Sequence, residues 1–537
     1  MPRIETVADV LRETAAQAPE RAAVISRRGS LTFAELDRQA DSLAQALLGT
    51  GLEPGDRVVL LVTPGPEMLV TAFAMARSGL IPVLVDPGMG RSNLRRCIEE
   101  SGPKGMVGVP QAVWALRLLR WASDSLRVWI TVGNLGPPNS RSWRTLVVGG
   151  KTERRSLPLV TGADPAAVAF TSGSTGPPKG VVYTHGMFLC QARILQRTFG
   201  VQSGEVDLAT FPLFALFDPV WGATSVFPRM DFTRPGKADP VEIAGAIRRH
   251  NVTHMFASPA LLGRLGAWAV ERGVRFPTLR RVLCAGAPVS DLVLEQSRSV
   301  LQGEADVHTP YGATEALPVT TISAGERLHL GSRPGFGVCI GRPVEGVEVE
   351  VIRITDECLP TWDGSLRVKA GDVGELVVWG ENVSSSYYRR PEADRSAKTL
   401  RGGRIGHRMG DLVRTDEAGR LWFCGRKSHR VTTAETTLFP VAWELMFNAH
   451  EAVKRSALVG IGLPGNQEPV LCVEPKRRLS RRERETLTRE LSALAAAEVA
   501  TRSIRRIVFL RDFPVDPRHN AKILRERLAE RVQEEER

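Results

Sequence analysis

The sequence predicts an α/β fold with a large, multi-lobed N-terminal domain and a small α+β C-terminal domain. The first observation behind this prediction is length, because 537 residues are too many for one compact core. The second is the alternation of helix-like and strand-like segments, which favours parallel sheets covered by helices. The third is a change of pattern after residue 425, where a unit with its own strands and amphipathic helices begins. We therefore expect domains at residues 1–425 and 426–537.

Helix, turn and strand signals follow one another near the N-terminus. Apolar residues recur at helical spacing over residues 32–48, and a turn at 52–56 comes next. The apolar run 57–62 then predicts a buried strand. Residues 67–78 predict a second helix and 81–86 a second strand. This alternation indicates a first α/β lobe.

Two further lobes are indicated downstream. Residues 132–164 are irregular and predict a long surface connection. Alternating strands and helices resume over residues 168–300, which indicates a second α/β lobe. From residue 344 short Val-rich strands are separated by Gly and Asp turns, which predicts a smaller β-rich lobe. The main domain boundary is expected at residues 425–428.

Composition narrows the classes of partner. The net charge is +12, so nucleic acid, anionic membranes and anionic substrates all have to be considered. The densest basic runs, 477–484 and 502–506, lack interleaved aromatics and any helix-turn-helix or zinc-finger spacing. We therefore expect a small-molecule partner and no nucleic acid, and the basic surface leaves docking of pathway enzymes open.

Cysteine usage and hydropathy indicate a cytoplasmic protein. The seven cysteines show no CxxC pair and no Cys/His cluster at metal spacing, which predicts buried thiols in a reducing compartment. Residues 1–20 lack the pattern of a signal peptide. The most apolar long stretch, 67–86, is interrupted by Arg77, Gly79 and Pro82, so we expect no transmembrane segment.

The strongest chemical signal is a loop rich in glycine and hydroxyl groups after the strand-like run 166–170. Glycines allow close backbone approach, hydroxyls and amides donate to phosphate oxygens, and a lysine adds positive charge. A flexible linker would not follow a buried strand and resume as the apolar run 181–185. Gly180 follows the lysine, so the loop is not a Walker motif. The predicted phosphate-binding residues are Thr171, Ser172, Gly173, Ser174, Thr175, Gly176 and Lys179.

This loop resembles the phosphate-loop signature of the adenylate-forming superfamily, and further motifs occur in that family's order along almost the whole chain. They are Leu31-Thr32-Phe33-Ala34-Glu35-Leu36, Ala285-Gly286-Ala287-Pro288, Tyr311-Gly312-Ala313-Thr314-Glu315, Met409-Gly410-Asp411, Gly425-Arg426 and Lys522. The resemblance implies an enzyme that joins a carboxylic acid to AMP and releases pyrophosphate, with ATP and Mg²⁺ as cofactors.

The resemblance assigns a role to each matching residue. Tyr311 offers a face on which adenine stacks, and Thr314 and Glu315 supply oxygen ligands for Mg²⁺. Asp411 accepts hydrogen bonds from the ribose hydroxyls, and Arg426 reaches the same sugar or the phosphates. The remaining nucleotide contacts are expected at Gly286, Ala287, Pro288 and Gly312, and Thr171 and Glu315 are expected to take part in catalysis.

Lys522 falls where the family keeps a catalytic lysine on its mobile C-terminal domain. Negative charge builds on the bridging oxygens as a carboxylate attacks the α-phosphorus, and a lysine delivered by domain closure would stabilise it. Asn520-Ala521 departs from the Ser/Thr-Gly that usually precedes this lysine. The alternative interpretation is an exposed helix lysine.

Other departures bear on the second half of the reaction. The family's hinge residue falls on Ser428, and Glu435 occupies the glycine position of the loop that lines the coenzyme A tunnel. A charged side chain there would hinder a phosphorylated thiol. Ala215 and Asp218 replace a histidine and a glycine that acyl-CoA synthetases often have. Asp218 also leaves an amino-bearing acid open as the substrate.

The segments 211–217, 424–431 and 514–523 look most like the β-lactone synthetases of bacterial long-chain olefin biosynthesis. That likeness implies a β-hydroxy acid that is adenylated and then closed by its own hydroxyl. The alternative is an acyl-CoA or acyl-AMP ligase for a medium or long fatty acid. A catalytically silent acyl-nucleotide-binding protein is disfavoured, because Lys179, Glu315, Asp411, Arg426 and Lys522 are all present.

Overall fold

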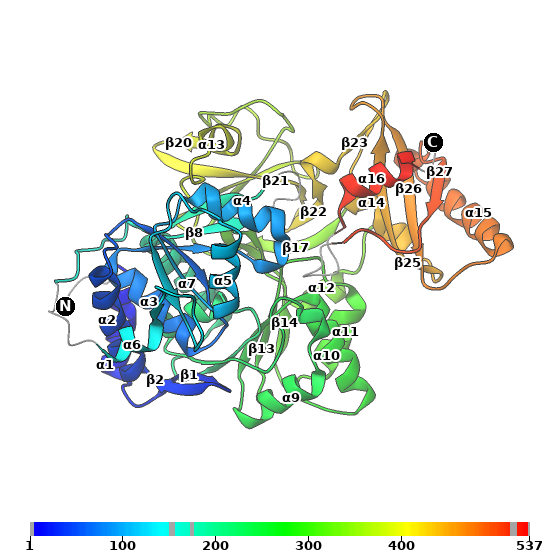
Figure 1. The fold of residues 1–537 in the computed structure, drawn as a ribbon. Coiled ribbons are helices and arrows are strands. Elements are labelled where there is room, and N and C mark those ends of the chain that lie inside the picture. The colour runs from blue at the N-terminus through cyan, green and yellow to red at the C-terminus, as the bar shows by residue number, and fades with distance from the viewer. Residues whose placement is uncertain (1–4, 150–155, 172–176, 516–522, 535–537) are drawn as a thin grey trace.

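The computed structural model describes residues 5–149, 156–171, 177–515 and 523–534. In these ranges the chain forms an α/β protein with three large sheets and a smaller C-terminal unit (Figure 1). The C-terminal unit, coloured orange to red, stands at one side of the rest of the molecule. The predicted fold class is therefore confirmed.

The first large sheet has the strand order β7-β6-β5-β3-β4-β8-β9 and is parallel apart from the β8–β9 hairpin. Its strands are β3 (Arg57–Leu61), β4 (Ile81–Leu84), β5 (Gly105–Gly108), β6 (Val128–Thr131), β7 (Arg141–Ser142), β8 (Pro165–Thr171) and β9 (Lys179–Thr184). The helices in this part of the chain are α1 (Val7–Gln17), α2 (Phe33–Gly49), α3 (Pro66–Ser78), α4 (Arg91–Ser101), α5 (Pro110–Leu118), α6 (Trp143–Val148) and α7 (His185–Phe199).

Helix α2 shows why these segments fold as predicted. The Thr32 hydroxyl accepts from the backbone amide of Glu35 at 3.2 Å, and the Glu35 carboxylate accepts from the amide of Thr32 at 2.8 Å. This capping box satisfies two amides that have no partner within the helix. Leu36, Leu43 and Leu47 then fall on one face and are fully buried.

The second large sheet has the order β14-β13-β12-β10-β11-β1-β2. Its strands are β1 (Ala22–Ser26), β2 (Gly29–Thr32), β10 (Val206–Ala209), β11 (Thr224–Val226), β12 (His254–Ala257), β13 (Arg281–Cys284) and β14 (Asp306–His308). The helices of this region are α8 (Asp218–Trp221), α9 (Pro240–Arg249), α10 (Pro259–Glu271) and α11 (Asp291–Ser299). Strand β1 pairs in parallel with β11, so the N-terminal segment completes the second sheet.

The third sheet forms the β-rich part and begins at Tyr311, earlier than the expected residue 344. Its first three strands look like short turns in the sequence, because each is interrupted by glycine or proline. The strands are β15 (Tyr311–Ala313), β16 (Ala316–Thr321), β17 (Val338–Pro343), β18 (Glu348–Ile352), β19 (Gly374–Trp379), β20 (Lys398–Arg401), β21 (Arg404–Thr415) and β22 (Leu421–Arg426). Helices α12 (Ala324–Leu330) and α13 (Pro391–Ala397) accompany them.

The C-terminal unit follows β22 and a short 3₁₀ turn at Lys427–His429. Its three-stranded sheet packs against helices through fully buried residues that include Phe447, Leu471 and Leu491. The elements are β23 (Val431–Thr432), β24 (Thr437–Leu438), α14 (Pro440–Asn448), β25 (Val453–Ile461), β26 (Glu468–Pro475), α15 (Arg481–Ala497), β27 (Arg506–Phe509) and α16 (Arg525–Glu534).

Two further expectations are corrected by the fold. The connection at 132–164 is not wholly irregular, since it contains β7 and α6. Cys358 is exposed because it lies in the loop after β18, so the prediction that every cysteine is buried is wrong. Among the described residues, no helix is long and apolar enough to cross a lipid bilayer.

Candidate nucleotide and acyl site

A cavity of about 2420 Å³ lies where the carboxyl ends of β13 and β14 meet the β15–β16 turn. Ligands of open α/β sheets bind at this edge, where strands end and loops begin. The cavity brings together ten of the predicted site residues from segments far apart in the chain. They are Thr171, Gly286, Ala287, Pro288, Tyr311, Gly312, Thr314, Glu315, Asp411 and Arg426.

Two glycines shape the backbone at this edge. Gly286 follows β13 and has a φ of +94°, a conformation that residues with side chains rarely adopt. A Cβ on Gly312 would come within 2.8 Å of the carbonyl oxygen of Ala316, which is closer than real contacts allow. Gly286 therefore allows the chain to turn after β13, and Gly312 allows the β15–β16 turn to pack closely.

Asp411 is buried and accepts hydrogen bonds from two other predicted site residues. One carboxylate oxygen accepts from the Tyr311 hydroxyl, and the other accepts from the Arg426 guanidinium at 2.7 Å. Arg426 also donates to the carbonyl of Met409 at 3.1 Å. The neighbouring carboxylate raises the pKa of Arg426, whereas burial raises the pKa of Tyr311 well above its usual value. The predicted adenine and ribose contacts thus form one connected group.

Thr314 and Glu315 form the turn between β15 and β16. The hydroxyl of Tyr183 donates to the carbonyl of Thr314 at 2.7 Å. The backbone amide of Ser384 donates to the carbonyl of Glu315, also at 2.7 Å. The Tyr387 hydroxyl donates to the Glu315 carboxylate at 2.7 Å. Residues outside the Tyr311–Glu315 motif therefore fix both the turn and the Glu315 carboxylate by hydrogen bonds.

The predicted phosphate loop joins β8 to β9, and residues 172–176 lie outside the described ranges. Ser172, Gly173, Ser174, Thr175 and Gly176 belong to that segment. Thr171 and Lys179 pair across the base of the hairpin. The Lys179 ammonium lies 5.0 Å from the centre of the Tyr387 ring, within cation–π range. The hairpin base therefore sits beside the Glu315 side of the cavity.

Lys398 completes this region. Its ammonium donates to the backbone carbonyl and hydroxyl of Ser384 at 2.6 and 2.9 Å. It also lies 5.6 Å from the centre of the Tyr387 ring, and burial lowers its pKa to about 8. The Tyr387 ring thus lies near two lysines while its hydroxyl reaches Glu315.

Tyr183, Tyr387 and Lys398 were missed by the sequence reasoning. Tyr387 and Lys398 are far from Glu315 in sequence, and neither belongs to the motifs that carry the resemblance. Tyr183 could have drawn attention, because it lies in the apolar run that follows the phosphate loop and carries a hydroxyl. An aromatic residue with a polar group at a strand position usually finds a partner when buried.

The C-terminal unit contributes another wall of the cavity. Glu444, Ile523 and Arg525 are among the lining residues. The Arg525 guanidinium binds the Glu444 carboxylate through two contacts of 2.5 and 2.7 Å. Lys522 lies outside the described residues, but Ile523, the next residue in the chain, lines the cavity.

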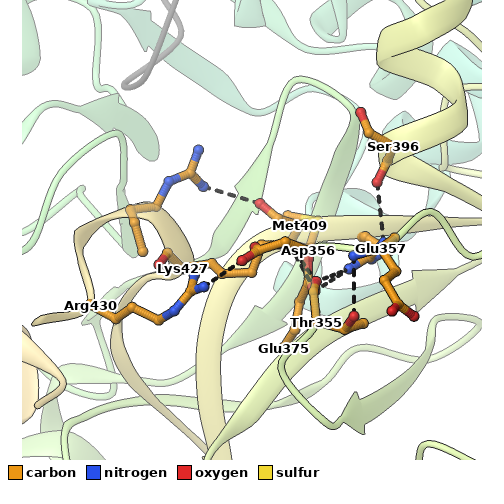
Figure 2. A network of polar contacts seen from close by, with 10 residues as sticks. Thr355, Asp356, Glu357, Glu375, Ser396, Met409, Lys427 and Arg430 are labelled. Carbon is orange, nitrogen blue, oxygen red and sulfur yellow. Dashed lines mark hydrogen bonds and ion pairs between the residues drawn. The ribbon is translucent and has the colours of Figure 1, made fainter. Parts of the chain in front are cut away.

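A polar network fixes the chain where the C-terminal unit begins (Figure 2). The Lys427 ammonium donates to the Glu375 carboxylate at 3.2 Å and to the carbonyl of Thr355 at 3.0 Å. Arg408 binds the same Glu375 carboxylate at 2.7 Å, and both of these side chains are only 2% exposed. Arg430 pairs with Asp356 at the edge of the network. Residues 427–430 are therefore attached to the β-rich part.

An aromatic cluster lines the cavity beyond the nucleotide contacts. Phe214 and Phe256 stack with ring centres 4.0 Å apart, and Phe211 and Phe217 meet Phe214 edge-on. All four rings line the cavity. This compartment suits an apolar acyl chain.

The two residues that differ from the acyl-CoA synthetase pattern in this region do not line the cavity. Ala215 and Asp218 are fully buried, and neither is among the cavity-lining residues. The Asp218 carboxylate accepts a hydrogen bond from the Ser225 hydroxyl and lies beside the carboxyl of Asp207. Burial raises the pKa of both carboxyls, that of Asp218 to about 7, so the pair holds a proton near neutral pH. Asp218 is therefore a core residue and does not face a substrate ammonium group.

Glu435 lies at the exposed tip of the β23–β24 hairpin. It is not among the residues that line the cavity, and its amide donates to the Thr433 hydroxyl at 3.2 Å. In this arrangement of the chain the Glu435 side chain therefore does not narrow the cavity.

Comparison with known proteins places these features in a family. Residues 11–388 match the family described as AMP-binding enzyme. The olefin beta-lactone synthetase of Xanthomonas campestris is 42% identical over 507 residues, covering 93% of this chain and 90% of that protein. The olefin beta-lactone synthetase of Stenotrophomonas maltophilia is 43% identical and covers 97% of each chain.

A solved structure shares the fold. It is an O-succinylbenzoate coenzyme A synthetase from Bacillus subtilis, in complex with ATP and magnesium ion. The TM-score is 0.76 at 22% identity, and the match covers 97% of this chain and 98% of that one. The similarity in fold thus extends through the C-terminal unit.

Proposed function

The chain belongs to the family of AMP-binding enzymes, and we propose that it converts a β-hydroxy carboxylic acid into a β-lactone. The first step joins the acid to AMP and releases pyrophosphate. The observation that carries the proposal is the 42–43% identity to two olefin beta-lactone synthetases over nearly the whole chain. The aromatic compartment beside the nucleotide contacts supports an apolar acid as substrate.

The adenylation step is assigned to the residues of the cavity. Tyr311 and Asp411 bind the nucleoside, and Arg426 and the phosphate loop from Thr171 to Lys179 bind the phosphates. The carboxylate oxygen of the acid attacks the α-phosphorus, and the bond to pyrophosphate breaks. Lys522 stabilises the charge that develops on the oxygens in this transition state.

The residues present fit a magnesium ion held mainly by ATP. Among the described residues there is no group of three or more His, Cys, Asp or Glu side chains able to hold a metal. Mg²⁺ commonly binds through one or two protein oxygens together with substrate phosphates and water. Glu315 and Thr314 would supply those oxygens. When bound, the ion neutralises phosphate charge.

The second step is ring closure. The β-hydroxyl oxygen of the acyl group attacks the activated carbonyl carbon, and the bond from that carbon to the AMP oxygen breaks. The hydroxyl proton leaves with AMP or to solvent. The enzyme's contribution is to hold the hydroxyl against the carbonyl, because a fixed near-attack geometry greatly raises the effective concentration of the nucleophile.

Adenylation and the exchange of substrate and product require different positions of the C-terminal unit, which we place at residues 426–537. Adenylation needs Lys522 in the cavity, whereas entry of the acid and exit of the lactone need the unit withdrawn. The close approach of Glu444 and Arg525 to the cavity supports this assignment.

The proposal is tested by product identity. The purified protein is incubated with ATP, Mg²⁺ and a panel of β-hydroxy acids, with and without coenzyme A, and products are identified by mass spectrometry. A β-lactone, AMP and pyrophosphate are expected in both mixtures. Formation of acyl-CoA in place of the lactone would make the chain an acyl-CoA ligase.

A further inference from the structure

Helix α5 and the loop after β6 present an apolar patch to solvent, made of Trp114, Leu118 and Leu135. Leu118 is 73% exposed, Leu135 87% and Trp114 38%. The indole nitrogen of Trp114 donates to the carbonyl of Leu135 at 3.2 Å, so the helix and the loop are in contact. Large apolar side chains grouped in this way on a surface mark an interaction site.

The same helix forms part of the cavity wall. Ala112, Ala115 and Leu119 line the cavity, and they follow one another at helical spacing. Trp114 and Leu118, also one turn apart, are exposed to solvent and are not among the lining residues. Helix α5 therefore has the exposed apolar patch on its outer side and part of the cavity wall on its inner side.

The segment of the chain that carries the patch is rich in basic residues. Residues 101–149 contain six lysines and arginines and one acidic residue, Asp124. Arg117 donates to the carbonyl of Pro138, and Arg127 donates to the carbonyls of Ser123 and Asp124. Carbonyl oxygens fix a guanidinium without cancelling its charge. Arg120, two residues after Leu118, is also exposed.

We propose that the α5 face docks on an anionic lipid surface. Exposed leucines and a tryptophan among arginines have the chemistry of an interfacial contact, in which apolar groups enter the lipid and cations bind the headgroups. An acidic protein would satisfy the charges, but it would leave two highly exposed leucines without an apolar environment. The benefit of such docking rests on the proposed function, since an apolar acid could pass from the lipid to the cavity across α5.

The test is co-sedimentation with vesicles, which needs neither ATP nor turnover. Vesicles of phosphatidylcholine containing phosphatidylglycerol should bind the full chain, and vesicles of phosphatidylcholine alone should bind it less. Leu118→Glu should weaken binding about tenfold or more, because it removes an apolar side chain that would enter the lipid and adds repulsion from the anionic headgroups. Arg120→Glu should weaken it by about fivefold or more, and only on the anionic vesicles.

Leu463→Glu is the matched control, because Leu463 is 81% exposed in the C-terminal unit and far from α5 in the sequence. It should bind vesicles like the parent chain. Circular dichroism of each variant reports whether the fold is retained, and Leu135→Glu provides a second substitution outside the helix. The proposal is overturned if the anionic vesicles do not retain the parent chain, or if all four variants bind equally.

Activity with a short, water-soluble β-hydroxy acid separates this proposal from the proposed function. Leu118→Glu should turn over the soluble acid like the parent chain and lose activity toward a long-chain acid presented in anionic vesicles. If the chain bound vesicles but activated no acid, the docking proposal would be supported and the proposed function would be contradicted. If the parent chain and Leu118→Glu were equally active on the acid presented in vesicles, docking would have no role in delivering the acid to the cavity.

Discussion

The Tyr387 hydroxyl donates a hydrogen bond to the Glu315 carboxylate at 2.7 Å, while the ring of the same tyrosine lies 5.0 Å from the Lys179 ammonium. One side chain therefore touches both the carboxylate assigned to Mg²⁺ and the lysine at the end of the phosphate loop. We infer that Tyr387 is a positioning residue that fixes the direction of the Glu315 carboxylate.

Tyr387→Phe should keep the ring and lose the hydrogen bond. A hydrogen bond to a charged group contributes about 1.5 to 3 kcal/mol, so adenylation should slow by roughly tenfold to a hundredfold. The Mg²⁺ concentration for half-maximal pyrophosphate release should rise. Tyr388→Phe is the control, because Tyr388 stacks near Arg57 and Arg389 instead. An unchanged Mg²⁺ requirement in Tyr387→Phe would argue against positioning.

Glu315→Gln should reduce acid-dependent pyrophosphate release more strongly than Tyr387→Phe. It removes the negative charge while keeping the shape, and loss of one preorganised electrostatic contact lowers rates by about 10² to 10³. Steady-state pyrophosphate release at saturating acid measures the effect. Wild-type turnover in this variant would exclude Glu315 from the site.

Lys522→Ala should abolish adenylation and leave ATP binding nearly intact. The lysine is assigned to the transition state, so its loss should appear in the rate of chemistry and not in affinity. Single-turnover formation of acyl-AMP and equilibrium binding of ATP are the two measurements. Lys476→Ala is the matched control in the same unit. Parallel losses of rate and affinity would mean that Lys522 binds the ground state.

A 3-deoxy analogue of an accepted β-hydroxy acid should stop the reaction at enzyme-bound acyl-AMP. Ring closure uses the substrate's own hydroxyl, so the analogue has no nucleophile. Mass spectrometry should detect one equivalent of acyl-AMP and little further pyrophosphate release, and adding coenzyme A should not change this. Efficient acyl-CoA formation from either acid would contradict the proposed second step.

The buried pair Asp207 and Asp218 should make stability depend on pH. Burial raises both carboxyl pKa values, so between the unfolded value and about pH 7 the folded chain holds more protons than the unfolded chain. Stability therefore falls as pH rises through this range and levels off once the folded pair ionises. Asp218→Asn should make the melting temperature less dependent on pH. The exposed Asp372→Asn should not, and an equal pH profile for all three proteins would rule out the effect.

Local signals predicted much of the fold. The capping box at Thr32 and the burial of Leu36, Leu43 and Leu47 reproduce the expected first helix, and the chain keeps its alternation of strands and helices through β14. The pairing of β1 with β11 could not be predicted, because it joins residues about two hundred positions apart and leaves no local trace. The early start of the β-rich part was hidden by glycine and proline in its first strands.

In the site, too, the local motifs could be recognised in the sequence, but the contacts between distant motifs could not. The motif around Tyr311 and the motif around Asp411 were each recognised, but the hydrogen bond between their side chains spans 100 positions and belongs to the fold. Asp218 shows the opposite error. Its place beside a predicted pocket motif drew attention, whereas its carboxyl points into the core toward Ser225. A sequence position does not specify the direction of a side chain.

Lys427 and Arg408 share the buried Glu375 carboxylate, and this has a mechanical consequence (Figure 2). Pulling Lys427 away would remove one of the two cations bound to the buried Glu375 carboxylate and its hydrogen bond to Thr355, which opposes the movement of Lys427. The hinge about which the C-terminal unit rotates should therefore lie at Ser428 or at a later residue. Arg426, the first residue of the unit by sequence, is also the last residue of β22, so it should stay with the large domain and keep its hydrogen bond to Asp411 throughout the movement.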